Sequence, residues 1–213
     1  MKKALLFANG QVGEPEVAQI AAKEFDFIIA ADGGMRNALG VGRIPHYVVG
    51  DLDSIDASLR EQFKQTTFIH RPSQELNDLE KSLQFCESLG VTHITLLGIS
   101  GKRLDHTLNN LSVLCRYDRR FHLIIYDPYS QIFLIRDRWE YTGRKGQLIS
   151  LIPLGKVAGI TTGGLAFPLQ AESLGFGYRE GLSNYIVQNP VTVHIQSGVL
   201  AVFVMYREEE GRQ

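Results

Sequence analysis

The sequence predicts an α/β parallel sheet with helices on both faces, followed by an all-β sandwich. Up to residue 127, apolar strand-like runs alternate with helical segments. The strand-like runs are apolar on both faces, which is typical of parallel strands covered on each side. After Pro128, short strand-like runs follow one another between glycine-rich turns, which favours an antiparallel sandwich or barrel. We therefore expect an α/β domain at residues 1–128 and a β-sandwich domain at 129–213.

The elements of the first domain follow from hydrophobic spacing. Strands are expected at residues 3–8, 25–32, 47–51, 66–72, 93–99 and 121–127. Helices are expected between them at residues 14–24, 34–42, 55–63, 77–89 and 104–116. The first helix has Pro15 near its start and apolar residues at helical spacing, and the third has Leu59 and Phe63 on one side.

The second domain has no lasting helical period. Strands are expected at residues 131–136, 139–143, 146–154, 157–164, 191–198 and 199–206. The segment "GFGYREG" at residues 175–181 is interpreted as a loop between strands, and residues 207–213 as a solvated tail.

Composition excludes several classes of protein. Apolar residues make up 44% and charged residues 21% of the 213, and 22 basic residues against 23 acidic ones give a net charge of −1. This balance does not support binding to nucleic acid or to a membrane by bulk charge. No segment approaches the roughly 20 apolar residues of a membrane span, and the run Ala4–Ala8 is too short for a signal peptide. Cys86 and Cys115 are expected to be buried free thiols, so we expect a cytoplasmic protein.

Polar loops follow every expected strand of the first domain. They contain Asn9, Asp32, Asp51, residues 72–78, residues 98–106 and Asp127. Ligands of open parallel sheets bind at the carboxyl ends of the strands, which lie on one edge. The expected site therefore lies where these six loops meet.

Asp51 and Asp53 stand in the stretch "YVVGDLDSID" after the third expected strand. In an extended segment, two side chains at this spacing share a face, and two carboxylates held close together favour a bound cation such as Mg²⁺. The alternative is a solvated, Asp-rich turn that caps the next helix, and Asp56 is expected to act as such a cap.

Two further loops of this edge carry charge. Asp78 follows Asn77, a candidate N-cap, so Asp78 either serves the helix dipole alone or is a third metal-directed carboxylate. In "GISGKRLDH", Lys102 and Arg103 precede a helix and form a candidate anion site, although the loop lacks the spacing of a Walker A motif. Asp105 is either a first-turn helix residue or part of this site.

This edge combines several acids with a basic glycine loop, and the chain shows no constellation for a Ser, Thr or Cys nucleophile. The pattern favours phosphoryl transfer at a metal–nucleotide site, by positioning and charge neutralisation.

Four segments together resemble the thiamin pyrophosphokinase family. They are "ADGGMRNAL…GRIPHYVVGDLDSI", "SQELNDLEKSL", "GISGKRLDHTLNNL" and "TTGGLAFPL…GLSN", and they occur in the order seen in that family. The resemblance extends from Asp32 to about residue 197, and it implies a nucleotide-binding catalytic domain at residues 1–128 and a thiamin-binding domain at residues 129–213. It implies transfer of diphosphate from ATP to the hydroxyl of thiamin, giving thiamin diphosphate and AMP, by a homodimer with the thiamin site at its interface.

The resemblance also implies residue roles. It implies Asp51, Asp53 and Asp78 as Mg²⁺ ligands, nucleotide and phosphate contacts by Asp32, Gln74, Arg103 and Asp105, and thiamin contacts by Ser183, Asn184 and Phe167. Two positions depart from the family pattern: Asn77 stands where Thr is common, and Phe167 where Trp is common. Phe167 either stacks on thiamin or is a core aromatic residue.

The expected mechanism is in-line attack by the thiamin hydroxyl on the β-phosphorus of ATP, with Arg103 assisting. Asp105 or Asp51 would accept the hydroxyl proton. The rival interpretations are a pyrophosphokinase that acts on a pterin alcohol and a non-catalytic nucleotide or thiamin sensor.

Overall fold

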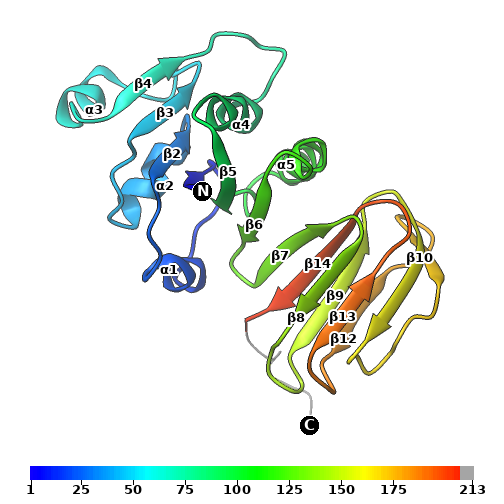
Figure 1. Ribbon diagram of the computed structural model, residues 1–213. Coiled ribbons are helices and arrows are strands. Elements are labelled where there is room, and N and C mark those ends of the chain that lie inside the picture. Colours follow the sequence, from blue (N-terminus) through cyan, green and yellow to red (C-terminus); the bar gives the residue numbers. More distant parts are fainter. Residues whose placement is uncertain (207–213) are drawn as a thin grey trace. The chain divides into compact units, whose positions relative to one another are not determined.

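The computed structural model describes residues 1–206, so the predicted tail at 207–213 lies outside the described residues. The chain divides into two compact units, Met1–Pro128 and a second that begins at Tyr129 (Figure 1). Within residues 1–206, no helix is both long and apolar enough to cross a membrane.

The first unit is built on six parallel strands in the order β6-β5-β1-β2-β3-β4. The strands are β1 (Lys2–Phe7), β2 (Phe27–Ala31), β3 (Tyr47–Gly50), β4 (Thr67–His70), β5 (Val91–Leu97) and β6 (His122–Tyr126). The helices are α1 (Glu14–Ile20), α2 (Gly34–Gly40), α3 (Ala57–Gln62), α4 (Asp78–Ser88) and α5 (Leu104–Tyr117). The predicted parallel sheet is confirmed.

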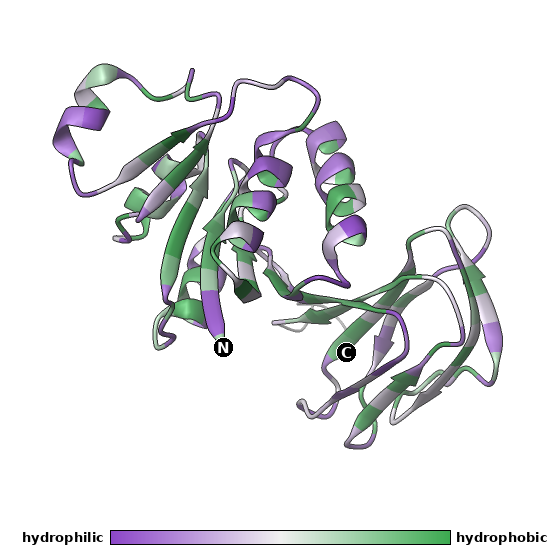
Figure 2. Cartoon of the chain, turned by 45° about the horizontal axis from the view of Figure 1, so that its top comes forward, coloured by the Kyte–Doolittle hydropathy of each residue, from purple (hydrophilic) through white to green (hydrophobic). Residues whose placement is uncertain are grey.

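Helices cover both faces of this sheet, as predicted. Because β–α–β crossovers are right-handed, the connections β1–β2 and β2–β3 place α1 and α2 on one face. The chain then returns from β4 to β5, which places α4 and α5 together on the other face, where they contact each other (Figure 1). Burial on both sides explains why the residues from Ala4 to Phe7 of β1 are all fully buried. Figure 2 shows the strands of this sheet as largely hydrophobic.

The strand order changes direction between β1 and β5, and the loops after these strands are bonded to each other. The N–H of Gly10 donates to the carbonyl of Gly98 at 2.6 Å, and that of Gln11 to the carbonyl of Ser100 at 2.7 Å. A Cβ on Gly10 would lie 2.2 Å from the Ser100 oxygen, so only glycine allows this approach. Such a change of direction is the usual ligand position in an open α/β sheet.

The second unit is an antiparallel sandwich. One group of strands has the order β12-β9-β14-β7 and the other β11-β10-β13-β8. The strands are β7 (Ser130–Ile135), β8 (Arg138–Tyr141), β9 (Leu148–Pro153), β10 (Lys156–Gly163), β11 (Glu172–Gly175), β12 (Gly181–Tyr185), β13 (Val191–His194) and β14 (Leu200–Met205). Buried aliphatic residues of both groups form one core. The sequence did not predict β11 and β12, which are short and rich in glycine and polar residues, but residues 176–180 between them do form the predicted loop.

Local capping follows the predicted chemistry. The Asp56 carboxylate accepts a hydrogen bond from the N–H of Leu59 at 2.8 Å and caps α3, and Asn77 caps α4 through the N–H of Glu80 at 2.8 Å. Neither cysteine forms a disulfide within residues 1–206, as predicted, but only Cys86 is buried, since Cys115 is partly exposed.

Candidate functional site

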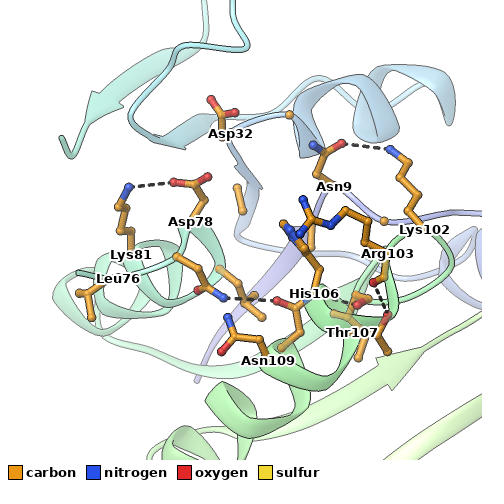
Figure 3. A pocket seen from close by; sticks show the side chains of 18 of the residues that line it. Asn9, Asp32, Leu76, Asp78, Lys81, Lys102, Arg103, His106, Thr107 and Asn109 are labelled. Carbon is orange, nitrogen blue, oxygen red and sulfur yellow. Dashed lines mark hydrogen bonds and ion pairs between the residues drawn. The ribbon is translucent and has the colours of Figure 1, made fainter. Parts of the chain in front are cut away.

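The carboxyl ends of the parallel strands surround a cavity of about 600 Å³, which we call the strand-end cavity (Figure 3). Its lining comes from the loops after β1, β2, β3 and β5, from the segment that leads into α4, and from the first turns of α5. The predicted residues Asp32, Asp51, Gln74, Asp78 and Arg103 all line it. Asp53 and Asp105 are not among the lining residues.

Three acids in this cavity form a group that we call the carboxylate cluster: Asp32, Asp51 and Asp78. Each offers an oxygen, and these oxygens all lie within 4.8 Å of one another. They come from the end of β2, the end of β3 and the start of α4. Gly50 allows this proximity, because a Cβ there would lie 2.7 Å from the Cβ of Asp32 and 3.1 Å from Oδ1 of Asp78.

Asp53 does not join the carboxylate cluster. The prediction assumed an extended segment, in which Asp51 and Asp53 share a face. Leu52 instead has a φ of 63°, which turns the chain between the two acids. Asp53 remains close to Asp51, since its backbone nitrogen lies 3.4 Å from Oδ1 of Asp51. A hydrogen bond between the two side chains and the negative charge of Asp51 raise the pKa of Asp53.

The environment of Asp32 is unusual for an acid. The residue is 6% exposed, and its Oδ1 is buried without a hydrogen-bond partner within residues 1–206. Burial raises the pKa of Asp32, the charges of Asp78 and Asp51 raise it further, and a hydrogen bond from the Ser54 hydroxyl opposes this. A buried carboxylate oxygen without a partner is costly unless a cation binds it. The donor set, all carboxylate oxygen, fits a hard divalent cation.

Asp51 is kept ionised by its neighbours. Burial would raise the pKa of Asp51, but hydrogen bonds from Asp53 and Gln74 and the charge of Lys81 lower it below its ordinary value. Lys81 also donates to Oδ1 of Asp78 at 3.0 Å (Figure 3). Lys81 was not among the predicted site residues. The signal for it was its position three residues after Asp78, which places both on one side of α4.

The predicted basic loop enters α5 beside the cavity. Arg103 donates to both carboxylate oxygens of Asp105, from Nε at 3.1 Å and from Nη2 at 2.5 Å. This pairing lowers the pKa of Asp105. Lys102 donates to Oδ1 of Asn9 at 3.2 Å (Figure 3). All of these basic side chains are exposed.

In the second unit, Ser183 and Asn184 lie within β12, and Phe167 lies in the segment between β10 and β11. Ser183 has a φ of 56°, and the register of β12 against β9 shifts between Gly181 and Asn184, so the strand is bulged there. The N–H of Ser183 donates to the buried hydroxyl of Ser150 at 3.0 Å. Bulges often redirect side chains beside functional sites.

The side-chain amide of Asn184 forms its hydrogen bonds within the protein. Its Oδ1 accepts from the N–H groups of Phe167 and Tyr185 at 3.1 and 2.9 Å, and its Nδ2 donates to the carbonyl of Phe167 at 2.7 Å. It therefore holds the chain at Phe167. Phe167 is 66% exposed, so the alternative that it is a core residue is wrong.

Comparison with known proteins identifies the family. Residues 18–126 match the family model "Thiamin pyrophosphokinase, catalytic domain", and residues 136–200 match "Thiamin pyrophosphokinase, vitamin B1 binding domain". The chain belongs to the thiamin pyrophosphokinase family. The two matches lie in the first and the second unit, respectively.

Individual proteins of this family are similar over most of the chain. Thiamin pyrophosphokinase 1 of Caenorhabditis elegans is 26% identical over 212 residues, covering 88% of this chain and 84% of its own. Thiamine pyrophosphokinase of Bacillus subtilis (strain 168) is 26% identical over 182 residues, covering 81% and 84%.

Solved structures of the thiamin pyrophosphokinase family share the fold. The Bacillus subtilis crystal structure superposes with a TM-score of 0.82 at 21% identity, covering 96% of this chain and 99% of that one. The Candida albicans thiamin pyrophosphokinase gives 0.83 at 17% identity, covering 96% and 89%.

The structure explains one departure from the expected thiamin pyrophosphokinase pattern, the asparagine at position 77. Asn77, in place of Thr, caps α4 with its Oδ1 and also places its Nδ2 3.4 Å from Oδ1 of Asn110 on α5. Asn110 in turn donates to the carbonyl of Ile99 at 2.8 Å. A threonine side chain has no second polar group for this bridge, which joins the two helices that border the strand-end cavity.

Proposed function

We propose that this enzyme transfers the diphosphate of ATP to the hydroxyl of thiamin, giving thiamin diphosphate and AMP, with Mg²⁺ in the carboxylate cluster. The observation that carries the proposal is the cluster itself, in a chain of this family. Within residues 1–206 the buried Oδ1 of Asp32 has no hydrogen-bond partner, and the cluster lines the cavity that the loops after β1 and β5 also line. Asp32, Asp51 and Asp78 would hold the cation, and Asp53 stays a predicted ligand. Bound there, Mg²⁺ would neutralise charge on the phosphate oxygens.

The residues of the first unit would bind and orient the nucleotide. The exposed side chains of Lys102 and Arg103 would contact phosphate oxygens at the start of α5, and Gln74 would contact the nucleotide from the loop before α4. In the reaction, a bond forms between the thiamin oxygen and the β-phosphorus, and the bond from that phosphorus to the oxygen of AMP breaks.

The hydroxyl proton would pass to Asp51 or Asp105. The pKa values of both are lowered, so both are ionised at neutral pH and both are weak bases. A weak base suffices, because phosphoryl transfer has a loose transition state in which proton removal contributes little.

The second unit would bind thiamin. Ser183 and the exposed Phe167 ring are the proposed contacts, with Asn184 close to them. By the family resemblance, we further propose a homodimer in which the thiamin site lies at the interface. The cytoplasmic location stays a prediction. Sedimentation tests the dimer, and a fully active monomer would contradict the shared site.

The activity is tested by incubating the protein with ATP, Mg²⁺ and thiamin and quantifying AMP and thiamin diphosphate. Formation of ADP, or a requirement for a pterin alcohol, would overturn the proposal. The metal site is tested with Asp51→Asn and Asp53→Asn, and we expect Asp51→Asn to lose more than about 100-fold in turnover. Near-normal Mg²⁺-dependent turnover of Asp51→Asn would contradict the metal site, and near-normal turnover of Asp53→Asn would contradict Asp53 as a ligand.

The same stretch of sequence offers a matched control. Asp56→Asn changes the third acid, which caps α3 and lies outside the cavity lining. We expect this variant to keep its Mg²⁺ dependence and at most a modest loss of stability, about 1 kcal/mol or less, because asparagine also caps helices.

A further inference from the structure

Lys81 is a buried cation inside the strand-end cavity. Its side chain is 4% exposed, and it lines the cavity from α4, one turn after Asp78. Its ammonium group lies 3.0 Å from Oδ1 of Asp78 (Figure 3). Burying an ammonium group carries a large desolvation cost, so its presence here requires a partner.

Among the cavity-lining residues, Lys81 differs from the other two cations. Lys102 and Arg103 are exposed and come from the loop at the start of α5. Lys81 instead projects from a regular helix whose first turn is fixed by the Asn77 cap. A group on a packed helix is held in place before any ligand binds, which is what precise recognition of a charged group requires.

The acidic residues of the cavity lining are a second reason to expect a functional role for the Lys81 ammonium group. The lining contains four acids (Asp32, Asp51, Glu75, Asp78) and three cations (Lys81, Lys102, Arg103). A triphosphate is strongly anionic and would be repelled by the carboxylates without positive charge beside them. Lys81 is the cation bonded to the carboxylate cluster, so it lies where repulsion of a phosphate would be strongest.

We propose that Lys81 binds a phosphate oxygen of the diphosphate that is transferred, and so is a further substrate-binding residue of this enzyme. The proposal rests on the proposed function. An ammonium group has three N–H donors, and within residues 1–206 its recorded hydrogen bond goes to Asp78 alone. Two donors therefore remain for phosphate oxygens, and lysine is a common point-charge ligand of phosphates.

The competing explanation is that Lys81 only holds Asp78 in position. The two explanations differ in their effect on cation binding. If Lys81 positions Asp78, its loss weakens binding of a divalent cation to the carboxylate cluster. If Lys81 serves the phosphates, its loss removes a positive charge beside the cluster, and cation binding without nucleotide stays the same or becomes tighter.

The test uses Lys81→Met, which keeps an unbranched apolar side chain, one atom shorter than that of lysine, and removes the ammonium group. Calorimetric titration measures binding of an ATP analogue with a methylene group between the α- and β-phosphorus atoms, in the presence of Mg²⁺. AMP, which lacks the diphosphate, is titrated in parallel, and Mn²⁺ binding is measured without nucleotide by electron paramagnetic resonance. Lys64→Met, an exposed lysine of the same unit, is the matched control.

We expect Lys81→Met to bind the analogue about 10- to 100-fold more weakly, since a charge-assisted hydrogen bond is lost. AMP affinity should change less than about twofold, and Mn²⁺ should bind equally or more tightly. Unchanged analogue affinity would overturn the proposal, as would Mn²⁺ binding weakened by the same factor as analogue binding. Lys64→Met should match the wild type throughout.

Folding is checked by circular dichroism. If Lys81→Met does not fold, Lys81→Arg and Lys81→Gln take its place, with partial analogue affinity expected for arginine and loss for glutamine. Equal affinities of these two variants would contradict a role for the charge. If the wild-type protein itself binds no triphosphate analogue, the proposed function fails, and this outcome is distinct from failure at Lys81 alone.

Discussion

The carboxylate cluster leads to the prediction that Asp32→Asn stabilises the cation-free protein. Asp32 lies with two other acids, and the cluster oxygens are within 4.8 Å of one another. At an effective dielectric constant of about 20, two unit charges at this distance repel by roughly 3.5 kcal/mol. Asparagine keeps the shape of the side chain and can accept the hydrogen bond from Ser54, while both repulsions that involve Asp32 disappear.

The net gain is smaller than the sum of these repulsions. Lys81 already offsets part of the charge of Asp78, whose side chain is 33% exposed and so is screened by solvent. The amide NH₂ group of asparagine would take the buried Oδ1 position, which has no hydrogen-bond partner within residues 1–206, and an unpaired buried donor destabilises the fold. We expect a net stabilisation of about 1–3 kcal/mol, which corresponds to a melting temperature higher by roughly 2–12 °C in a chain of this size.

Thermal unfolding followed by far-UV circular dichroism measures this difference, at neutral pH with a chelator and again with excess Mg²⁺. Wild type should gain stability from Mg²⁺ by linkage, and Asp32→Asn should gain little. Glu61→Gln, which neutralises an exposed acid on α3, controls for net charge. The reasoning is refuted if cation-free Asp32→Asn melts at or below the wild-type temperature, or if Mg²⁺ stabilises both proteins equally.

Three further predictions concern single residues. Burial raises the pKa of Glu16, so the folded protein binds the proton of this carboxyl more tightly than the unfolded chain does, and the stability of the fold falls as pH rises through that pKa. Glu16→Gln should therefore stabilise the protein at neutral pH but not near pH 4, which melting curves across pH will measure. Gly50→Ala should abolish AMP formation with the helical signal retained, because its Cβ would displace Asp32. Asn184→Ala, which removes three hydrogen bonds, should cost about 2–4 kcal/mol in chemical denaturation and expose Phe167 to faster proteolysis.

The parallel sheet and the edge that carries the site could be predicted because both depend on the hydrophobicity of whole segments and not on single contacts. Apolar runs such as that of β1 are buried on both faces, and a parallel sheet brings all strand ends to one edge whatever the strand order. Asp51 and Asp78 could therefore be placed in one site without knowledge of any contact. The short strands β11 and β12 carry no comparable signal.

Local details of the site could not be predicted in the same way. The pairing of Asp51 with Asp53 assumed a regular strand, and the left-handed residue Leu52 breaks it. Lys81 is a polar residue on a helix, which hydrophobic spacing treats as solvent-facing, and only the packing around α4 shows that it is buried. Asn184 matched a family motif, but its hydrogen bonds, which run to the protein's own backbone, depend on the bulge beside it.

Backbone strain accompanies two of these exceptions, the turn at Leu52 and the bulge at Ser183 beside Asn184. In residues 1–206, four residues other than glycine have positive φ: Asp32, Leu52, Ala171 and Ser183. Each such conformation costs on the order of 1–3 kcal/mol and persists only where surrounding contacts enforce it. Three of the four are predicted site residues or lie between two of them, in both units. The strain is therefore concentrated where the chain departs from regular strands to aim polar groups, which is the expected position for residues retained for function at the expense of stability.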